Sequence, residues 1–258
     1  MTISSLPGYI QGYKFTDSAA FYDPTGNYFI DQAGFSANPA SRAEVVVGTP
    51  NFVDVNAARG IECDNSFHIY FNMPIISEGS IIAVWGAPGF VSAGTENITL
   101  ITCNGNTSNF SANTKLYLGF FSSVYSHYLT LASSVSAVRN IQPDSGIYAD
   151  CFVMDPTIGT KRPEAMNSAG TISTGATIAD NNIGYTLGGG GTASYDEPGT
   201  RTYREIIGNI NFNPASVAPL ASGNTLTLCE LHFFDTILTA SPTTAVETEL
   251  LALEAIYG

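Results

Sequence analysis

The C-terminal stretch from Thr225 to Gly258 joins a dense strand pattern to the one clear helical pattern in the chain. Leu226 to Phe234 is predicted to be a strand. Pro242 then suits the first position of a helix, and Ser241 suits its N-cap. The apolar residues of that helix recur at helical spacing, at Val246, Leu250, Leu253 and Tyr257. The pattern predicts one short C-terminal helix that packs as a lid on a β-rich body.

The rest of the chain is predicted to be strands. Residues 61–73 show the clearest alternation, with the odd positions apolar on one side of a strand pair and Asp64 to Ser66 at the turn. Residues 80–86 form a near-continuous apolar run, which is typical of a strand covered on both faces. Short strands at regular spacing indicate an all-β sandwich. We expect a single domain over residues 1–258, with elaborated loops at about 155–200.

The charge of the chain excludes several classes of partner. The 258 residues carry a net charge of −13, and only 12% of them are charged. Phosphate backbones and anionic membrane surfaces would be repelled, so we expect no nucleic acid and no membrane insertion. The N-terminal residues have neither the basic nor the apolar region of a signal peptide. The longest apolar run, residues 81–85, is too short for a transmembrane segment.

The four cysteines do not have the spacing of a metal or redox site. Cys63, Cys103, Cys151 and Cys229 lie far apart in the sequence, whereas zinc ligands and redox pairs come closely spaced. Reduced, buried cysteines are the favoured interpretation, and one or two disulfides are the alternative. We expect no metal and no cofactor.

The terminal residues resemble those of a known superfamily. The run CELHFFDTILTASPTTAVETELLALEAIYG is similar to the end of laminin-G-like domains of the concanavalin A-like lectin/glucanase superfamily, and IECDNSFHIYF followed by SIIAVW resembles its early strands. The resemblance implies a concanavalin-like antiparallel β-sandwich, or jelly roll, with one short C-terminal helix.

The catalytic motifs of that superfamily are not recognisable. Its glucanases carry two acids on one strand as nucleophile and acid/base, and the nearest match here is Glu62 with Asp64. The histidines, His68, His127 and His232, stand in no serine-nucleophile motif. We therefore expect a protein that is not an enzyme, with a polysaccharide hydrolase or lyase as the least favoured alternative.

Several residues allow both a structural and a functional interpretation. Asp23 to Asn27 is predicted to be a plain turn rather than a cation-binding loop. His68 is expected to face solvent or to be hydrogen-bonded on its strand, and Trp85 is expected in the core rather than at a sugar-stacking surface. Glu230 and His232 are predicted to be a polar pair on one face of a strand. A tentative glycan site combines hydrogen-bonding groups with rings: Asp180, Asn181, Asn182, Tyr185, Tyr195 and Tyr203.

Two functions are weighed. The first is a non-catalytic structural or adhesive module of a phage particle, such as a capsid decoration or tail-associated protein, made in the host cytoplasm and located in the virion. It would form a homo-oligomer and bind other virion proteins. The start at Met1, the missing signal peptide and the acidic composition motivate it. The alternative is a carbohydrate-binding module that recognises a cell-surface or extracellular glycan.

Overall fold

The computed structural model describes the chain in segments: residues 4, 6–33, 42–55, 58–71, 79–86, 98–104, 114–121, 124–129, 147–155, 160–166, 172–174, 178–179, 204–208 and 225–236. Between residues 98 and 207 the description is of backbone and strand pairing, with side chains described at Leu100, Ile147 and Ile207. The predicted C-terminal helix lies outside the described residues.

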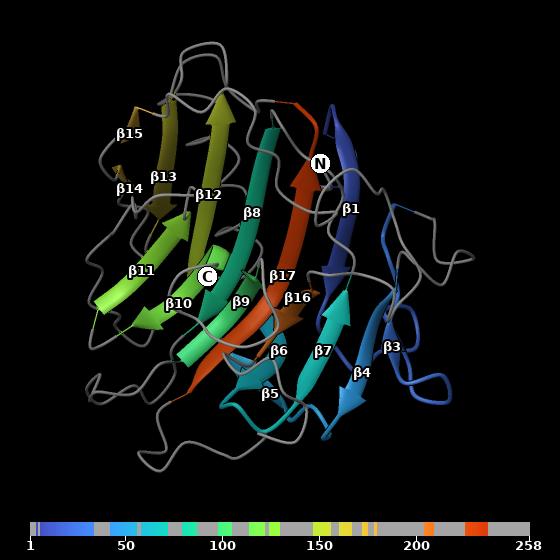
Figure 1. Ribbon diagram of the computed structural model, residues 1–258. Coiled ribbons are helices and arrows are strands. Elements are labelled where there is room, and N and C mark those ends of the chain that lie inside the picture. The colour runs from blue at the N-terminus through green and yellow to red at the C-terminus, as the bar shows by residue number, and fades with distance from the viewer. Residues whose placement is uncertain are drawn as a thin grey trace.

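The described strands form two antiparallel sheets (Figure 1). The first sheet contains β1 (Tyr9–Lys14), β5 (Phe52–Val55), β6 (Ala58–Cys63), β8 (Gly79–Gly86), β12 (Ile147–Asp155), β13 (Thr160–Met166), β14 (Ile172–Thr174), β15 (Ile178–Ala179) and β17 (Leu226–Phe234). The second contains β2 (Tyr22–Asp23), β3 (Tyr28–Phe29), β4 (Ala43–Val47), β7 (His68–Phe71), β9 (Ile98–Asn104), β10 (Thr114–Phe121), β11 (Val124–Leu129) and β16 (Arg204–Ile207).

Strands β8 and β17 are the centre of the first sheet, where Figure 1 shows them side by side. Every residue of both strands is buried, which confirms the prediction that residues 80–86 are covered on both faces. The other edge of β17 is shared, because β6 pairs with its first residues and β1 with its last. The strand predicted from the C-terminal sequence therefore pairs with three neighbours.

A β-bulge in β17 sets which side chains face the core. Leu228 pairs with Trp85 and Glu230 pairs with Val84, so Cys229 is an extra residue without a partner on β8. Leu228 and, after the bulge, Leu231 belong to the core cluster. Glu230 and His232 consequently lie on the outer face of the first sheet.

The core fills the space between the two sheets. Its largest side chains are aromatic, and Trp85 is completely buried among them, as predicted. Phe71 of β7 lies with its ring centroid 5.9 Å from that of Phe233 of β17, so the two sheets are in direct contact. Burying large aromatic and aliphatic side chains contributes about 1.5 to 3 kcal/mol each, which makes this layer the main source of stability.

Residues 61–71, the described part of the predicted strand pair over 61–73, connect the two sheets instead of forming a hairpin. Cys63 ends β6 in the first sheet and His68 begins β7 in the second. Asp64 accepts the amide of Ser66, and Asn65 takes a positive φ of 66°, so the predicted turn is present. The prediction of a strand pair was wrong, however. The alternation of apolar residues shows which side chains face the core, but it does not show which strands hydrogen-bond to each other.

Part of the region predicted as loops is strand. β13 runs through Lys161, Arg162 and Pro163 and pairs with β12, while β14 and β15 pair with β13. No apolar alternation marks this segment in the sequence, so its strand character comes from pairing with β12.

The part of the chain that the structure describes has no helix long and apolar enough to cross a membrane.

Candidate functional site

The tentative glycan site of the sequence analysis lies outside the described residues. This holds for all six of its members, Asp180, Asn181, Asn182, Tyr185, Tyr195 and Tyr203. Those residues remain a prediction. The described structure instead brings together three groups of polar residues that the sequence did not single out as groups.

The first group is a buried polar cluster between β1 and β17. Nε2 of His232 lies 2.8 Å from Oε2 of Glu230, so the predicted polar pair is confirmed. Nζ of Lys14 lies 3.0 Å from Oε1 of Glu230, and the hydroxyl of Tyr9 is 3.1 Å from Nδ1 of His232. Glu230 and His232 are each about 2% exposed. Asp31 lies nearby and accepts the amide of Gly12 on β1.

The electrostatics of this cluster reflect burial and pairing. Burial favours the protonated form of Glu230, but the hydrogen bond from His232 and the charge of Lys14 keep its pKa below the ordinary value. Burial and the carboxylates of Asp31 and Glu230 raise the pKa of Tyr9 far above the ordinary value. Both ring nitrogens of His232 are engaged and almost nothing of the ring is exposed. The cluster therefore ties β1 to β17 through groups that are already paired with one another.

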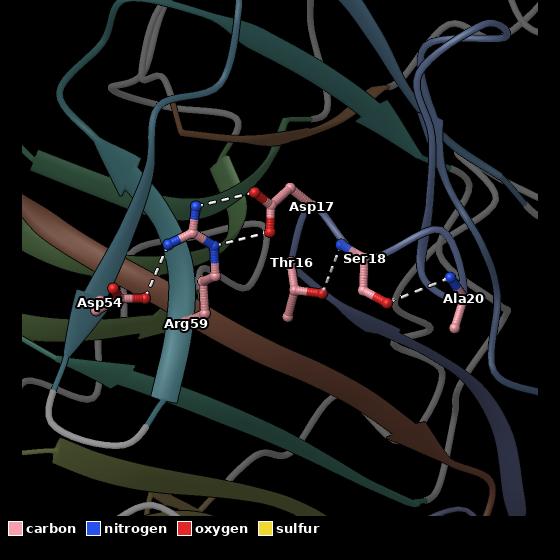
Figure 2. Close-up of polar contacts among 6 residues, drawn as sticks. All are labelled: Thr16, Asp17, Ser18, Ala20, Asp54 and Arg59. Atoms are coloured by element: carbon pink, nitrogen blue, oxygen red, sulfur yellow. Dashed lines mark hydrogen bonds and ion pairs between the residues drawn. The ribbon is translucent and has the colours of Figure 1, made fainter.

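The second group is an ion-pair bridge at the rim of the sandwich. Figure 2 shows the guanidinium of Arg59 between Asp17 and Asp54. Nε and Nη2 donate to Asp17 at 2.8 and 2.9 Å, and Nη1 donates to Asp54 at 2.8 Å. The bidentate bond lowers the pKa of Asp17. Both aspartates are exposed, so these ion pairs add little to the stability of the fold. Their main effect is to hold the loop after β1 against β5 and β6.

The Asp23 to Asn27 segment is the plain turn predicted from the sequence. The carboxylate of Asp23 accepts the amides of Thr25 and Gly26, and Asn27 has a positive φ of 56°. The amide of Gly26 is the main reason that the pKa of Asp23 is lowered. Its carboxylate is occupied by the turn itself, as in an Asx-turn.

The third group is a row of residues that crosses the second sheet. Register pairs run without interruption through all eight strands. From β2 to β11 the row consists of Asp23, Tyr28, Glu44, Tyr70, Ile206, Thr102, Tyr117 and Tyr128. We call it the tyrosine row.

The described members of the tyrosine row lie on the face away from the core. Phe29 and Ile69, the strand neighbours of Tyr28 and Tyr70, are completely buried in the core cluster. Since successive side chains point to opposite faces of a strand, Tyr28 and Tyr70 lie on the outer face. Both are partly exposed. The guanidinium of Arg42 lies 4.3 Å from the centroid of the Tyr28 ring.

His68 lies on β7 beside the tyrosine row and differs from its prediction. It is completely buried, and neither of its ring nitrogens has a hydrogen-bond partner in the part of the chain that the structure describes. The expectation that it faces solvent or is hydrogen-bonded was therefore wrong. Burial lowers its pKa from 6.5 to about 4, so it is held as a neutral ring beside Tyr70, 6.0 Å away between ring centroids. No residue pattern around His68 signals this burial.

His68 should make stability depend on pH between about 6.5 and 4. The unfolded chain binds a proton at His68 in this range and the folded chain does not, so folding is weakened as pH falls. The shift corresponds to a loss of about 3 kcal/mol from pH 7 to pH 4. Chemical denaturation across this range should show that loss for the wild type. His68→Leu should lack this loss, so the wild type should lose about 3 kcal/mol relative to the variant as pH falls from 7 to 4, and a difference that stays constant would contradict the assignment.

The remaining candidate residues carry no site in the described structure. Cys63 and Cys229 are buried free thiols, as predicted, and burial raises the pKa of Cys229 to about 12. The side chains of Cys103 and Cys151 lie outside the described residues. Glu62 accepts hydrogen bonds from Asn51 and Thr225, and Asp64 accepts the amide of Ser66. Among the described residues, no three His, Cys, Asp or Glu side chains are grouped as metal ligands.

Comparison with known proteins shows similarity in structure but not in sequence. No family model and no curated protein matches the chain. The fold is similar to domain 4 of AbnA, a GH43 extracellular arabinanase from Geobacillus stearothermophilus, in complex with arabinotriose. The TM-score is 0.54 at 10% identity, over 97% of this chain and 100% of that domain.

The fold is also similar to the binding domain of botulinum neurotoxin DC. The TM-score is 0.56 at 11% identity for its complex with SialylT, and 0.54 at 12% for its complex with rat synaptotagmin II. These matches cover 100% and 97% of this chain, which spans about half of the toxin domain, 53% and 52% respectively. At such low identity the likeness concerns the fold. The described part of the chain is an antiparallel β-sandwich of two sheets, the architecture predicted from the sequence.

Proposed function

We propose that this protein is a non-catalytic carbohydrate-binding module. Two solved domains with a similar fold are in complex with sugars, one with arabinotriose and one with SialylT. These similarities support the carbohydrate-binding function, and they do not support the virion role. The toxin domain is also in complex with a protein, synaptotagmin II. Virion partners and a homo-oligomer remain predictions from the sequence, and native mass spectrometry would test the latter.

The tyrosine row is the observation that carries the proposal. Four tyrosines occur in one row of register pairs, together with Thr102 and the carboxylate of Glu44. Aromatic rings bind the apolar face of a sugar, and carboxylate and hydroxyl oxygens bind its hydroxyl groups. A row across a whole sheet suits an extended oligosaccharide. The loop residues Asp180, Asn181, Asn182, Tyr185, Tyr195 and Tyr203 are the second proposed location.

Three of the described carboxylates are engaged in ion pairs, which favours a binding role over catalysis at those residues. Glu230 is held by His232 and Lys14, and Asp17 and Asp54 are held by Arg59. A glycosidase needs two carboxyl groups free to act on one bond, about 5 to 9.5 Å apart. Incubation with arabinan, β-glucan and alginate should therefore release neither reducing ends nor unsaturated products.

A glycan array probed with the full chain, followed by calorimetry on the best hit, tests the proposal. We expect Tyr70→Ala and Tyr117→Ala each to weaken binding about tenfold or more. One ligand ring stacked on an aromatic side chain contributes about 1 to 3 kcal/mol. Tyr195→Ala tests the loop location, and Ser18→Ala on the exposed rim is the control. An array without hits would overturn the proposal. A hit that all three tyrosine variants retain would overturn both locations.

A further inference from the structure

We propose that the C-terminal segment, residues 237–258, covers the outer face of the first sheet over β8 and β17. The sequence predicts a helix and a lid in this segment, but it does not predict which face of the sandwich the helix covers. The placement goes beyond the proposed function and stands whether or not the protein binds a glycan. It would leave the outer face of the second sheet as the face open to ligands.

The outer face of the first sheet is buried, although the second sheet packs against the opposite face. Ile82, Val84, Cys229 and Phe234 are each at most 1% exposed, yet none of them belongs to the core cluster. An antiparallel sheet with one face on the core commonly has its other face in water. These side chains are buried within a single copy of the chain, so their cover is part of the same chain.

The chain leaves β17 toward this outer face. Phe234, the last residue of β17, pairs with Ser80. Ser80 lies on the outer face, since its neighbour Ile81 belongs to the core cluster. The hydroxyl of Ser80 donates to the carbonyl oxygen of Thr236 at 3.3 Å. Two residues after the strand ends, the backbone has therefore turned back over the outer face, and the C-terminal segment begins there.

The predicted helix has a surface that matches this face. Its apolar stripe, Val246, Leu250, Leu253 and Tyr257, belongs to the one clear helical pattern in the chain. A helix over residues 242–257 would be about 24 Å long, and the nine residues of β17 span about 30 Å. The helix can therefore lie along β17 and β8, where its stripe would contact their buried apolar side chains.

The buried polar cluster is compatible with such a cover. Glu230 and His232 lie on the outer face and are each about 2% exposed, so the cover extends over them. Polar groups can be buried under apolar side chains at low cost only where they are paired with one another. Glu230 is paired with His232 and Lys14, and His232 also with Tyr9. The main polar groups of the cluster are thus paired without the help of solvent.

Thiol labelling of the full chain tests the placement, because Cys229 lies beside Glu230 outside the core cluster, whereas Cys63 belongs to that cluster. The wild type and Leu250→Asp are treated with iodoacetamide under native conditions, and labelled peptides are identified by mass spectrometry. A charge in the apolar stripe should open the cover and speed the labelling of Cys229 about tenfold or more, while Cys63 stays protected. Thr248→Asp, on the opposite side of the predicted helix, is the control and should leave Cys229 protected.

Two results would overturn the placement. Protection of Cys229 in Leu250→Asp would show that the segment covers another face. Labelling of Cys229 in the wild type that slows as the protein concentration rises would show that a second copy is the cover.

If Cys229 and Cys63 of Leu250→Asp are labelled at the same rate, the whole fold has opened, and a double-mutant cycle on milder variants decides. The effects of Leu250→Ala and of Ile82→Ala/Val84→Ala on the midpoint of urea denaturation should not add, because residues in contact are coupled. The effects of Leu250→Ala and of Tyr70→Ala on the second sheet should add. Additive effects in the first cycle, or coupling in the second, would overturn the placement.

Discussion

Replacing His232 by leucine should lower the free energy of unfolding by about 3 to 5 kcal/mol, because it leaves a buried carboxylate without its main partner. Nε2 of His232 lies 2.8 Å from Glu230, which is 2% exposed, and Lys14 alone would remain. In the wild type, the lowered pKa of Glu230 means that its pairing stabilises the fold above the ordinary titration range and is lost as pH falls. Urea denaturation at pH 7 measures the loss.

The double variant Glu230→Leu/His232→Leu distinguishes a buried ion pair from simple packing. Replacing both partners by apolar groups removes the stranded charge, so the double variant should be more stable than His232→Leu. Thr227→Val is the matched control on the same strand, since Thr227 is fully buried and its hydroxyl has no partner. This control should be neutral or stabilising. A double variant less stable than both single variants would show that the residues act independently.

Trp85→Ala should also cost about 3 to 5 kcal/mol, through the cavity left in the core. Trp85 is completely buried and is one of the largest side chains of the core cluster. Urea denaturation followed by circular dichroism measures the loss, because the variant has no tryptophan. In the wild type, emission of this single tryptophan should be at short wavelength in the folded state and shift to longer wavelength on unfolding.

Trp85→Phe is the control for this variant, because phenylalanine fills most of the space and should restore most of the lost stability. The same tryptophan separates two interpretations of the sequence. If Trp85 were a sugar-stacking residue, its emission would change on addition of a glycan, and the alanine variant would keep the stability of the wild type. Either result would contradict its place in the core.

The candidate site was much less predictable than the fold. Tyr70 and Tyr117 are far apart in the sequence, and they enter one row only because β16 and β9 pair between them. Lys14 and Glu230 are likewise brought together by the pairing of β1 with β17. Strand register depends on contacts between distant segments, and local periodicity contains no information about it.

The sequence by itself determined the fold class, the buried strand of Trp85 and the polar pair of Glu230 and His232. These follow from residue alternation and hydrophobicity along single strands, which is local information. The tertiary structure decided the rest: that residues 61–71 connect two sheets, that His68 is buried with no hydrogen-bond partner among the described residues, and that tyrosines line up across the second sheet. Those outcomes depend on which strands become neighbours, and many pairings satisfy the same alternation.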